Sequence, residues 1–233
     1  MNRSKRHSEN LTLVESSKAY SPVEAIKLLK QFKTAKFDET IEVHFNLGID
    51  PRHADQQLRG TTSLPHGTGK SITIAVITQG ENLQKATKAG ADFVGGDDII
   101  EKIAGGWLDF DLLIASPEMM SKVGRLGRTL GTKGLMPNPK AGTVTPDIEK
   151  AVQEFKAGKL EYRNDKFGNL HIGIGKHSFS EQQILENFDS IYETVVKIKP
   201  SKSKGVYLKS VSLCSSMSPG IAVETQKLKW KEN

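Results

Sequence analysis

Two different strand patterns divide this chain into a middle section and two flanking sections. Residues 71–78 form a nearly continuous run of apolar and β-branched side chains, which is typical of a strand covered on both faces. Residues 40–47 alternate apolar and polar side chains, which predicts a strand with one buried face. Helical patterns and short strands alternate after the continuous run, so the middle section predicts an α/β unit with a largely parallel sheet. Strands of the first kind return after Gly158.

Caps and apolar periodicity place the other elements. Ser21, Pro22 and Glu24 match a capping box with proline in the first turn, so a helix is expected over residues 21–33. Asp97 or Asp98 is expected to cap a helix that ends near residue 105. The remaining helices are expected at 81–89, 147–155 and 180–196, and after Ser116. The remaining strands are expected at 91–94, 110–115, 160–163, 170–174 and 205–213.

The segment Gly124–Thr145, called the basic segment below, is the most unusual part of the chain. It contains five glycines and two prolines, and the surrounding residues 119–146 carry five Lys and Arg and no acid. This composition predicts a long loop, and long loops in compact domains are commonly functional. Uninterrupted positive charge suits a polyanion, because each cation placed on a phosphate releases a counterion. A loop that is merely solvated remains the alternative.

The charge balance of the whole chain also favours an acidic partner. The 233 residues carry a net charge of +6, which suits nucleic acid or an anionic surface. No apolar run approaches the roughly 18 residues that a membrane span needs, so no membrane partner is expected.

The two ends of the chain are polar. Residues 1–15 lack an apolar run, so we expect no secretory signal, and Arg3, Lys5 and Arg6 predict a basic arm. The tail after Val223 is expected to be mobile. The single cysteine, Cys214, excludes an intramolecular disulfide and is consistent with a reducing compartment.

Two motifs that would indicate an enzyme are incomplete. Residues 67–71 end like a P-loop, but Leu64 stands where the first glycine is required, and the segment precedes a strand instead of following one. Residues 78–83 lack the glycine pattern of a dinucleotide site. A nucleotide-dependent enzyme built on the middle section is therefore only the alternative reading.

No metal site or cofactor is expected either. The six histidines are spread along the chain, and His44, His171 and His177 do not have the spacing of metal ligands. Cys214 lies in a strand pattern and is expected to be a small buried hydrophobic residue, not a nucleophile. We therefore expect no catalytic residue.

Several blocks of the sequence resemble the bacterial-type ribosomal protein L1 family. They run in order from about Tyr20 to Val223, and the most specific is Gly-Leu-Met-Pro-Asn-Pro-Lys at 134–140. The others are Lys-Phe-Asp-Glu-Thr at 36–40, Asn-Leu-Gly-Ile-Asp-Pro at 46–51, Leu-Pro-His-Gly-Thr-Gly-Lys at 64–70, Gly-Ala-Asp-Phe-Val-Gly at 90–95 and Tyr-Arg-Asn-Asp-Lys at 162–166.

The resemblance implies a two-domain architecture of α/β and α+β type. A discontinuous α+β domain I, the rRNA-binding domain, would be built from residues 1–67 and 160–233. An inserted three-layer, Rossmann-like α/β domain II would span residues 68–159. Two hinge crossings are then expected near 67–70 and 157–160, where glycines suit backbone rotation.

The resemblance also implies a function that is not enzymatic. Family members bind 23S-type rRNA of the large ribosomal subunit and form the mobile L1 stalk near the tRNA exit site, where they assist release of deacylated tRNA. Many bacterial members repress translation of their own operon mRNA. The expected partners are therefore large-subunit rRNA, exit-site tRNA and the operon mRNA, for a protein that is a monomer when free. The expected location is the ribosome of the bacterial cytoplasm, or that of a mitochondrion or plastid.

Matching motifs give the residues that the resemblance implies for rRNA binding. They are Phe37, Thr40, Asp165, Lys166, Gly168, Ser210, Ser216 and Met217. Hydroxyl groups can meet 2′-OH groups and phosphates, a lysine can neutralise phosphate, and a glycine permits close backbone approach. The alternative roles are structural: Phe37 in a core, and residues 165–168 as a plain hairpin turn.

The basic segment supplies the expected secondary contact to tRNA or other RNA. Its candidate residues are Arg125, Arg128, Lys133 and Lys140. The chain departs from the family pattern at Thr132, which replaces a proline and is expected to loosen the segment. It departs again at Ser218, which replaces a glycine in the last turn and puts close RNA contact there in question.

Overall fold

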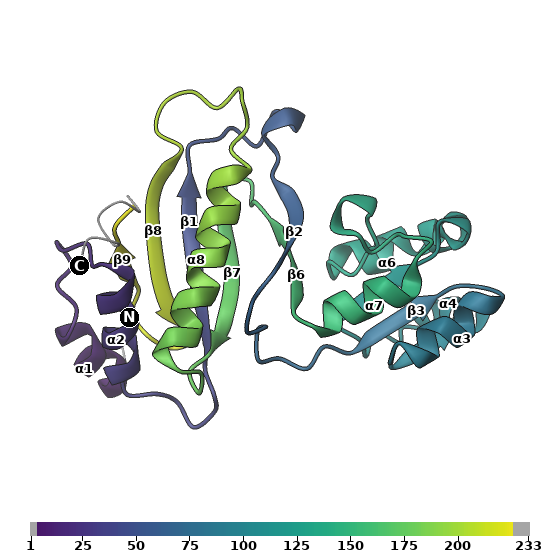
Figure 1. Ribbon diagram of the computed structural model, residues 1–233, viewed down its shortest axis with the longest axis horizontal. Coiled ribbons are helices and arrows are strands. Elements are labelled where there is room, and N and C mark those ends of the chain that lie inside the picture. Colours follow the sequence, from purple (N-terminus) through teal and green to yellow (C-terminus); the bar gives the residue numbers. More distant parts are fainter. Residues whose placement is uncertain (1–3, 226–233) are drawn as a thin grey trace. The chain divides into compact units, whose positions relative to one another are not determined.

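The computed structural model describes residues 4–225, which mix helices with several sheets (Figure 1). By its internal contacts the chain divides into two compact units, Met1–Gly69 with Tyr162–Asn233, and Lys70–Glu161. We call them the terminal unit and the inserted unit. Among the described residues, no helix has both the length and the apolar character needed to cross a membrane.

The terminal unit is built around β1 (Thr40–Leu47). This strand pairs antiparallel with β7 (Asn169–Lys176) on one edge and with β8 (Leu208–Ser215) on the other, and β9 (Ile221–Val223) extends the sheet beyond β8. In Figure 1, α8 (Glu181–Lys197) lies over β1 and β7. It contacts β7, while α2 (Pro22–Gln31) contacts α8, β8 and β9.

The alternating pattern of β1 has the predicted effect. Ile41, Val43 and Phe45 are 0% exposed, whereas the polar residues between them are half-buried. One face of the sheet therefore belongs to the core, and the opposite face is polar. The predicted bounds of this strand, 40–47, are confirmed.

Capping boxes begin both helices that cover the sheet. Ser21 and Glu24 cap α2 as predicted, with Pro22 in the first turn. Ser180 and Gln183 cap α8 in the same way. The stripe of α8 that is buried consists of Ile184, Phe188, Ile191, Tyr192 and Val195.

Asn187 joins three segments of the terminal unit from the middle of α8. Its side chain is fully buried, and its amide nitrogen donates to the carbonyl oxygens of Gly67 (2.9 Å) and Ile174 (2.7 Å). Its amide oxygen accepts from the backbone N–H of His66 (3.1 Å). Because all three bonds are made by one side chain, Asn187 fixes both α8 and the end of residues 64–67 against β7.

The inserted unit has a parallel three-stranded sheet in the order β4–β3–β5. Its strands are β4 (Phe93–Gly95), β3 (Ile74–Ile77) and β5 (Leu112–Ala115). Two separate clusters of buried side chains, one including Ile74 and Val76 and the other Ala75 and Ile77, show that both faces of β3 are covered. The first cluster includes residues of α3 (Glu81–Lys88) and α7 (Ile148–Lys156). The second includes residues of α4 (Asp97–Ala104), α5 (Met120–Val123) and α6 (Gly127–Thr132), so helices lie on both sides of the sheet.

Several elements were not expected from the sequence. The helix α1 (Lys5–Thr12) occupies part of the predicted basic arm, so that prediction is wrong for Lys5 and Arg6, while Arg3 lies outside the described residues. The helix is held because the buried Asn10 side chain bonds to the backbone of Lys33. The strand β2 (Arg59–Ser63) pairs with β6 (Lys159–Arg163), and β9 follows the last turn. Of the tail after Val223, only residues 224 and 225 are described.

The basic segment is more ordered than its composition predicted. Short 3₁₀ turns at Gly124–Leu126 and Pro139–Ala141 flank α6, and a third, Pro117–Met119, precedes α5 where a helix was expected. A fourth lies at Ala54–Gln56 in the terminal unit. The hydroxyl of Thr132, the last residue of α6, donates to the carbonyl oxygens of Arg128 and Thr129. Neither Asp97 nor Asp98 is the N-cap of α4, because Gly96 takes that place.

Replacing Asn187 by leucine should destabilise the terminal unit selectively. The change leaves three backbone groups without their partner, and we expect a loss of about 2–4 kcal/mol in the free energy of opening. Hydrogen exchange of the β1 amides should accelerate accordingly, whereas the β3 amides of the inserted unit should keep their rates. Gln182→Leu, an exposed change on the same helix, is the control and should shift exchange by less than about 0.5 kcal/mol. Equal protection of β1 in the two variants would contradict this role for Asn187.

Candidate nucleic-acid interface

The side of the β7–β1–β8 sheet opposite the core carries polar side chains along its whole length. The register places Glu42 beside Cys214, His44 between His171 and Ser212, and Asn46 between Asn169 and Ser210. We call this surface the polar face; it comprises Thr40, Glu42, His44, Asn46, Asn169, His171, Gly173, Lys176, Ser210, Ser212, Cys214 and the following Ser216. Strand alternation points every second residue of a strand to the same side, and the register aligns these rows across the three strands.

The structure places the predicted rRNA-binding residues on or around this one surface, in two groups. Phe37, Thr40, Ser216 and Met217 belong to the end where β1 begins, which we call the Ser216 end. Asp165, Lys166 and Gly168 form the turn before β7, which meets β1 at Leu47; together with Ser210 they mark the Lys166 end. The sequence prediction did not identify the middle of the face.

At the Ser216 end, two large apolar side chains are exposed. Phe37 is 55% exposed and Met217 is 51% exposed, so Phe37 does not belong to a core. The hydroxyl of Ser216 accepts a hydrogen bond from the backbone N–H of Thr40 (3.1 Å), while the Lys176 ammonium donates to the Thr40 hydroxyl (2.9 Å). The Ser216 hydroxyl therefore has a structural partner within the chain.

The buried residue Glu39 connects the chain segments that form the Ser216 end. Its carboxylate is 1% exposed and accepts hydrogen bonds from the backbone N–H groups of Ala35 (2.6 Å) and Met217 (3.2 Å) and from the hydroxyl of Ser215. Burial raises the pKa of the Glu39 carboxyl, but these hydrogen bonds lower it more, so the pKa lies below its ordinary value. The charged carboxylate thus positions the segments that carry Phe37 and Met217.

The last turn is also closed by the residue that departs from the family pattern. The Ser218 hydroxyl accepts a hydrogen bond from the backbone N–H of Ser215 (2.8 Å). Ser218 therefore holds the turn that presents Met217.

At the Lys166 end, two of the predicted residues have structural roles. Asp165 accepts hydrogen bonds from the backbone N–H groups of Phe167 and Asn169, both at 2.8 Å, and these bonds form the turn. Gly168 is buried with φ of 83°, and a methyl group there would lie 3.2 Å from the carbonyl oxygen of Leu47. Gly168 is therefore required by the turn itself and offers no open backbone.

Lys166 and its neighbour Phe167 are the exposed residues of this turn. Phe167 is 70% exposed, and the Lys166 ammonium lies 5.1 Å from the centre of its ring. Phe167 is an aromatic residue within a polar turn of the sequence, but it was not among the predicted rRNA-binding residues. Both ends of the polar face thus carry exposed apolar side chains suited to stacking.

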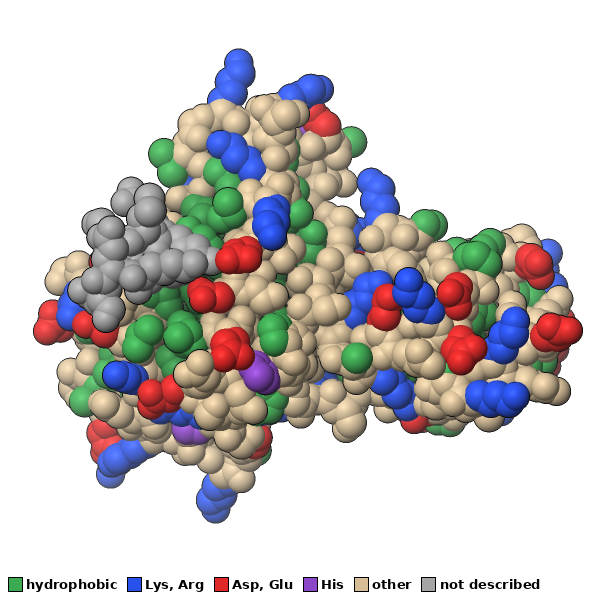
Figure 2. Space-filling view, viewed as in Figure 1, with side chains coloured by type: hydrophobic (Ala, Val, Ile, Leu, Met, Phe, Trp, Pro, Cys, Tyr) green, Lys and Arg blue, Asp and Glu red, His purple; other side chains and the backbone are tan. Residues whose placement is uncertain are grey.

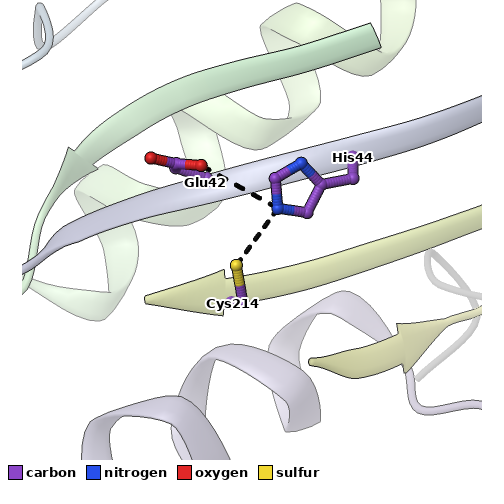
Figure 3. A group of neighbouring side chains, drawn as sticks. All are labelled: Glu42, His44 and Cys214. Carbon is purple, nitrogen blue, oxygen red and sulfur yellow. Dashed lines mark hydrogen bonds and ion pairs between the residues drawn. The ribbon is translucent and has the colours of Figure 1, made fainter. Parts of the chain in front are cut away.

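The middle of the polar face brings together residues far apart in the sequence (Figure 3). His44 Nε2 lies 3.1 Å from Cys214 Sγ, and His44 Nδ1 lies 2.8 Å from His171 Nδ1. The sequence patterns did not predict that these two histidines meet, and Cys214 is half-buried and hydrogen-bonded. Strand alternation placed Glu42 and His44 on one face, but only the register brings the partners beside them.

Burial shifts the protonation of this central group. Burial, together with the neighbouring His171, lowers the pKa of His44, while Glu42 opposes the change. Burial and the charge of Glu42 raise the pKa of Cys214 to about 11, so its thiol is protonated at neutral pH. One donor atom each from Glu42, His44 and Cys214 lie within 4.8 Å of one another, which makes them candidate metal ligands.

The candidate cations of the basic segment are exposed on the inserted unit. Among the described residues Arg125, Arg128, Lys133 and Lys140 form no ion pair, whereas Lys122 nearby pairs with Asp97 at 2.7 Å. The glycines among them, Gly124, Gly127 and Gly131, have helical backbone, and an added methyl group would meet no atom of the described chain within 4 Å. Neither backbone conformation nor internal packing requires these glycines.

Acid should loosen the Ser216 end through Glu39. Because the folded-state pKa of Glu39 is depressed, its stabilisation is complete above the ordinary value of 4.5 and is lost as pH falls through the folded-state pKa. Glu39→Gln, which places an NH₂ group where a carboxylate accepts, should cost about 1–3 kcal/mol at pH 7. Hydrogen exchange of the β1 and β8 amides should be faster in Glu39→Gln than in the wild type at pH 7. This difference between the two proteins should become smaller below pH 4. A difference that stays constant with pH would argue against the charged carboxylate as the cause.

One comparison with known proteins bears on this surface. The family model of the ribosomal protein L1p/L10e family matches residues 29–219, which include β1, β7, β8 and the whole inserted unit. This is a family of structural, RNA-binding proteins of the ribosome and not a family of enzymes. Because the match covers most of the 233 residues, the chain belongs to the ribosomal protein L1p/L10e family.

Proposed function

We propose that this protein binds 23S-type rRNA through the polar face and its two ends, and that it forms the mobile L1 stalk near the tRNA exit site. The observation that carries the proposal is one continuous surface of hydroxyl, amide and imidazole groups with exposed apolar side chains at both ends. The family of the chain supports rRNA as the partner.

The chemistry of the surface suits folded RNA better than a DNA duplex. Hydroxyl and amide groups such as Ser210, Ser212 and Asn46 can bond to 2′-OH groups, which distinguish RNA. Phe37, Met217 and Phe167 can stack on unpaired bases or sugars. Shape and stacking therefore supply much of the specificity in this proposal.

Positive charge at the edges of the polar face adds phosphate contacts. Lys166 is exposed at one end, and Lys176 lies beside Thr40 at the other. Charged side chains of both signs are interspersed on the side of the molecule seen in Figure 2, which gives a polyanion no continuous patch there. Lys166 and Lys176 thus place positive charge at the two ends of the polar face.

Truncating the exposed apolar side chains should weaken rRNA binding without destabilising the fold. We expect Phe167→Ser and Met217→Ser each to lose about 1–3 kcal/mol of binding, a five- to 150-fold weaker Kd, as for other stacking side chains. Crosslinking followed by sequencing first identifies the bound rRNA segment, whose transcript then serves in the titration. Val196→Ser is the matched control, because Val196 is 45% exposed but lies on α8, which covers the core face. If Phe167→Ser and Met217→Ser bind the transcript as tightly as the wild type and the control, the two ends of the polar face are not part of the rRNA site.

The same surface can serve translational repression. We propose that operon mRNA with a fold like the rRNA segment competes for the polar face, because one surface cannot hold two such RNAs. The crosslinking experiment would recover both RNAs from the same residues, and recovery of rRNA alone would refute the repressor role.

We further propose that the basic segment contacts exit-site tRNA transiently and so assists its release. Four exposed cations without ion pairs among the described residues support a phosphate partner. Glycine in a helix costs about 1 kcal/mol relative to alanine, so glycines facing open space fit a surface that another backbone approaches closely.

Changing Arg125, Arg128, Lys133 and Lys140 together to glutamine should separate the two RNA contacts. We expect the affinity for the rRNA transcript and its salt dependence to stay unchanged, because those contacts belong to the terminal unit. The lifetime of the stalk–tRNA contact, measured by single-molecule energy transfer on translating ribosomes, should shorten. A salt slope reduced by about 3, as the loss of four phosphate contacts requires, would instead make the basic segment part of the primary site.

A further inference from the structure

Three chemically different donor groups converge at the middle of the polar face (Figure 3). Glu42 and His44 are two residues apart on β1 and therefore point to the same side, and Cys214 of β8 is the register partner of Glu42. His44 Nε2 lies 3.1 Å from Cys214 Sγ and 3.9 Å from Glu42 Oε2.

The spacing of these atoms fits a tetrahedral ion. Zinc binds thiolate sulfur at about 2.3 Å and imidazole nitrogen or carboxylate oxygen at about 2.0–2.2 Å, which separates tetrahedral ligand atoms by roughly 3.5 Å. The two distances around His44 Nε2 lie on either side of this value. Small rotations of the half-buried side chains would therefore complete the geometry.

A second pair of contacts orients the imidazole for this role. His44 Nδ1 faces His171 Nδ1 at 2.8 Å, and His171 Nε2 faces Asp165 Oδ2 at 3.7 Å. When the ring proton of His171 is on Nε2, which faces the Asp165 carboxylate, His171 Nδ1 accepts a hydrogen bond from the N–H of His44 Nδ1. This arrangement leaves the lone pair of His44 Nε2 directed at Cys214. A hydrogen bond at the second ring nitrogen of a ligating histidine usually fixes its tautomer and orientation, and His171 is the partner of His44 here.

Without a metal, His44 Nε2 and the Cys214 thiol lie at hydrogen-bond distance, 3.1 Å apart, and this tautomer lets the thiol donate. The thiol keeps its proton, because burial raises the pKa of Cys214 to about 11. A metal ion would take the place of that proton between sulfur and nitrogen, and the thiol proton would go to solvent.

We propose that Glu42, His44 and Cys214 bind a divalent zinc-type transition-metal ion on the polar face. The thiolate and imidazole favour zinc, or cobalt as its substitute, over magnesium and calcium, which prefer ligand sets of oxygen alone. Three side chains occupy three positions of a tetrahedral ion, and the fourth remains open to water or another ligand.

Cobalt titration of the full chain in the absence of RNA tests the site. We expect about one Co²⁺ per chain, a thiolate-to-cobalt charge-transfer band, and displacement of the cobalt by zinc. Cys214→Ser should remove the band, and His44→Gln should weaken binding at least about tenfold. His66→Gln is the matched control, because His66 also faces a glutamate, Glu186, and should leave the titration unchanged.

Alkylation of the thiol provides a second readout. Cys214 is the only cysteine of the chain, so the labelling rate reports on this site alone. Zinc should slow alkylation of the wild type but not of His44→Gln, and unchanged β1 hydrogen exchange in each variant would show that the fold is kept.

Absence of the charge-transfer band, or equal cobalt affinity in wild type and His44→Gln, would overturn the proposal. Alkylation that zinc does not slow would do the same. These results are separate from the rRNA titrations, so failure of either proposal leaves the other standing.

Discussion

The pairing of β1 on both edges is the constraint on which the terminal unit depends. β1 supplies the central row of core side chains on one face and the central row of polar side chains on the other. Its backbone groups are satisfied by β7 and β8, which lie more than 120 residues further along the chain. Because a strand's side-chain period is two, a slip of one residue would bury His44 and expose Phe45. The polar face therefore exists only in this register.

Local patterns in the sequence predicted the elements that depend on neighbouring residues. The alternation of residues 40–47 and the capping box at Ser21 depend only on adjacent side chains, and both are confirmed. β2 and α1 were missed because their stability comes from distant partners: β6 for the polar strand β2, and the Lys33 backbone for α1 through Asn10. The basic segment was predicted as a loop because of its glycines, yet Leu126 and Leu130 pack into the core of the inserted unit and its first part, residues 124–132, is helical.

The candidate site was likewise predictable where it depends on local motifs and not where it depends on tertiary contacts. Motif matching placed eight residues around one surface, but their individual roles depend on contacts that no motif displays. Gly168 and Asp165 build a turn, and the Ser216 hydroxyl is bonded to β1. The grouping of Glu42, His44 and Cys214 could not be predicted, since it needs the register between strands separated by some 170 residues in sequence. Exposure, which decided that Phe37 and Met217 lie outside the core, is likewise a tertiary property.

The discontinuity of the terminal unit has a consequence for the order in which the protein can fold during its synthesis. Residues 70–161 are contiguous, so the inserted unit can close its sheet as soon as those residues have left the ribosome. β1 emerges earlier but has no neighbour to pair with until β7 and β8 are made, and at about 5–20 residues per second that delay lasts on the order of ten seconds. During this interval its row of isoleucine, valine and phenylalanine is uncovered, as is typical of a segment that needs a chaperone. A nascent chain therefore completes its inserted unit first and acquires the polar face last.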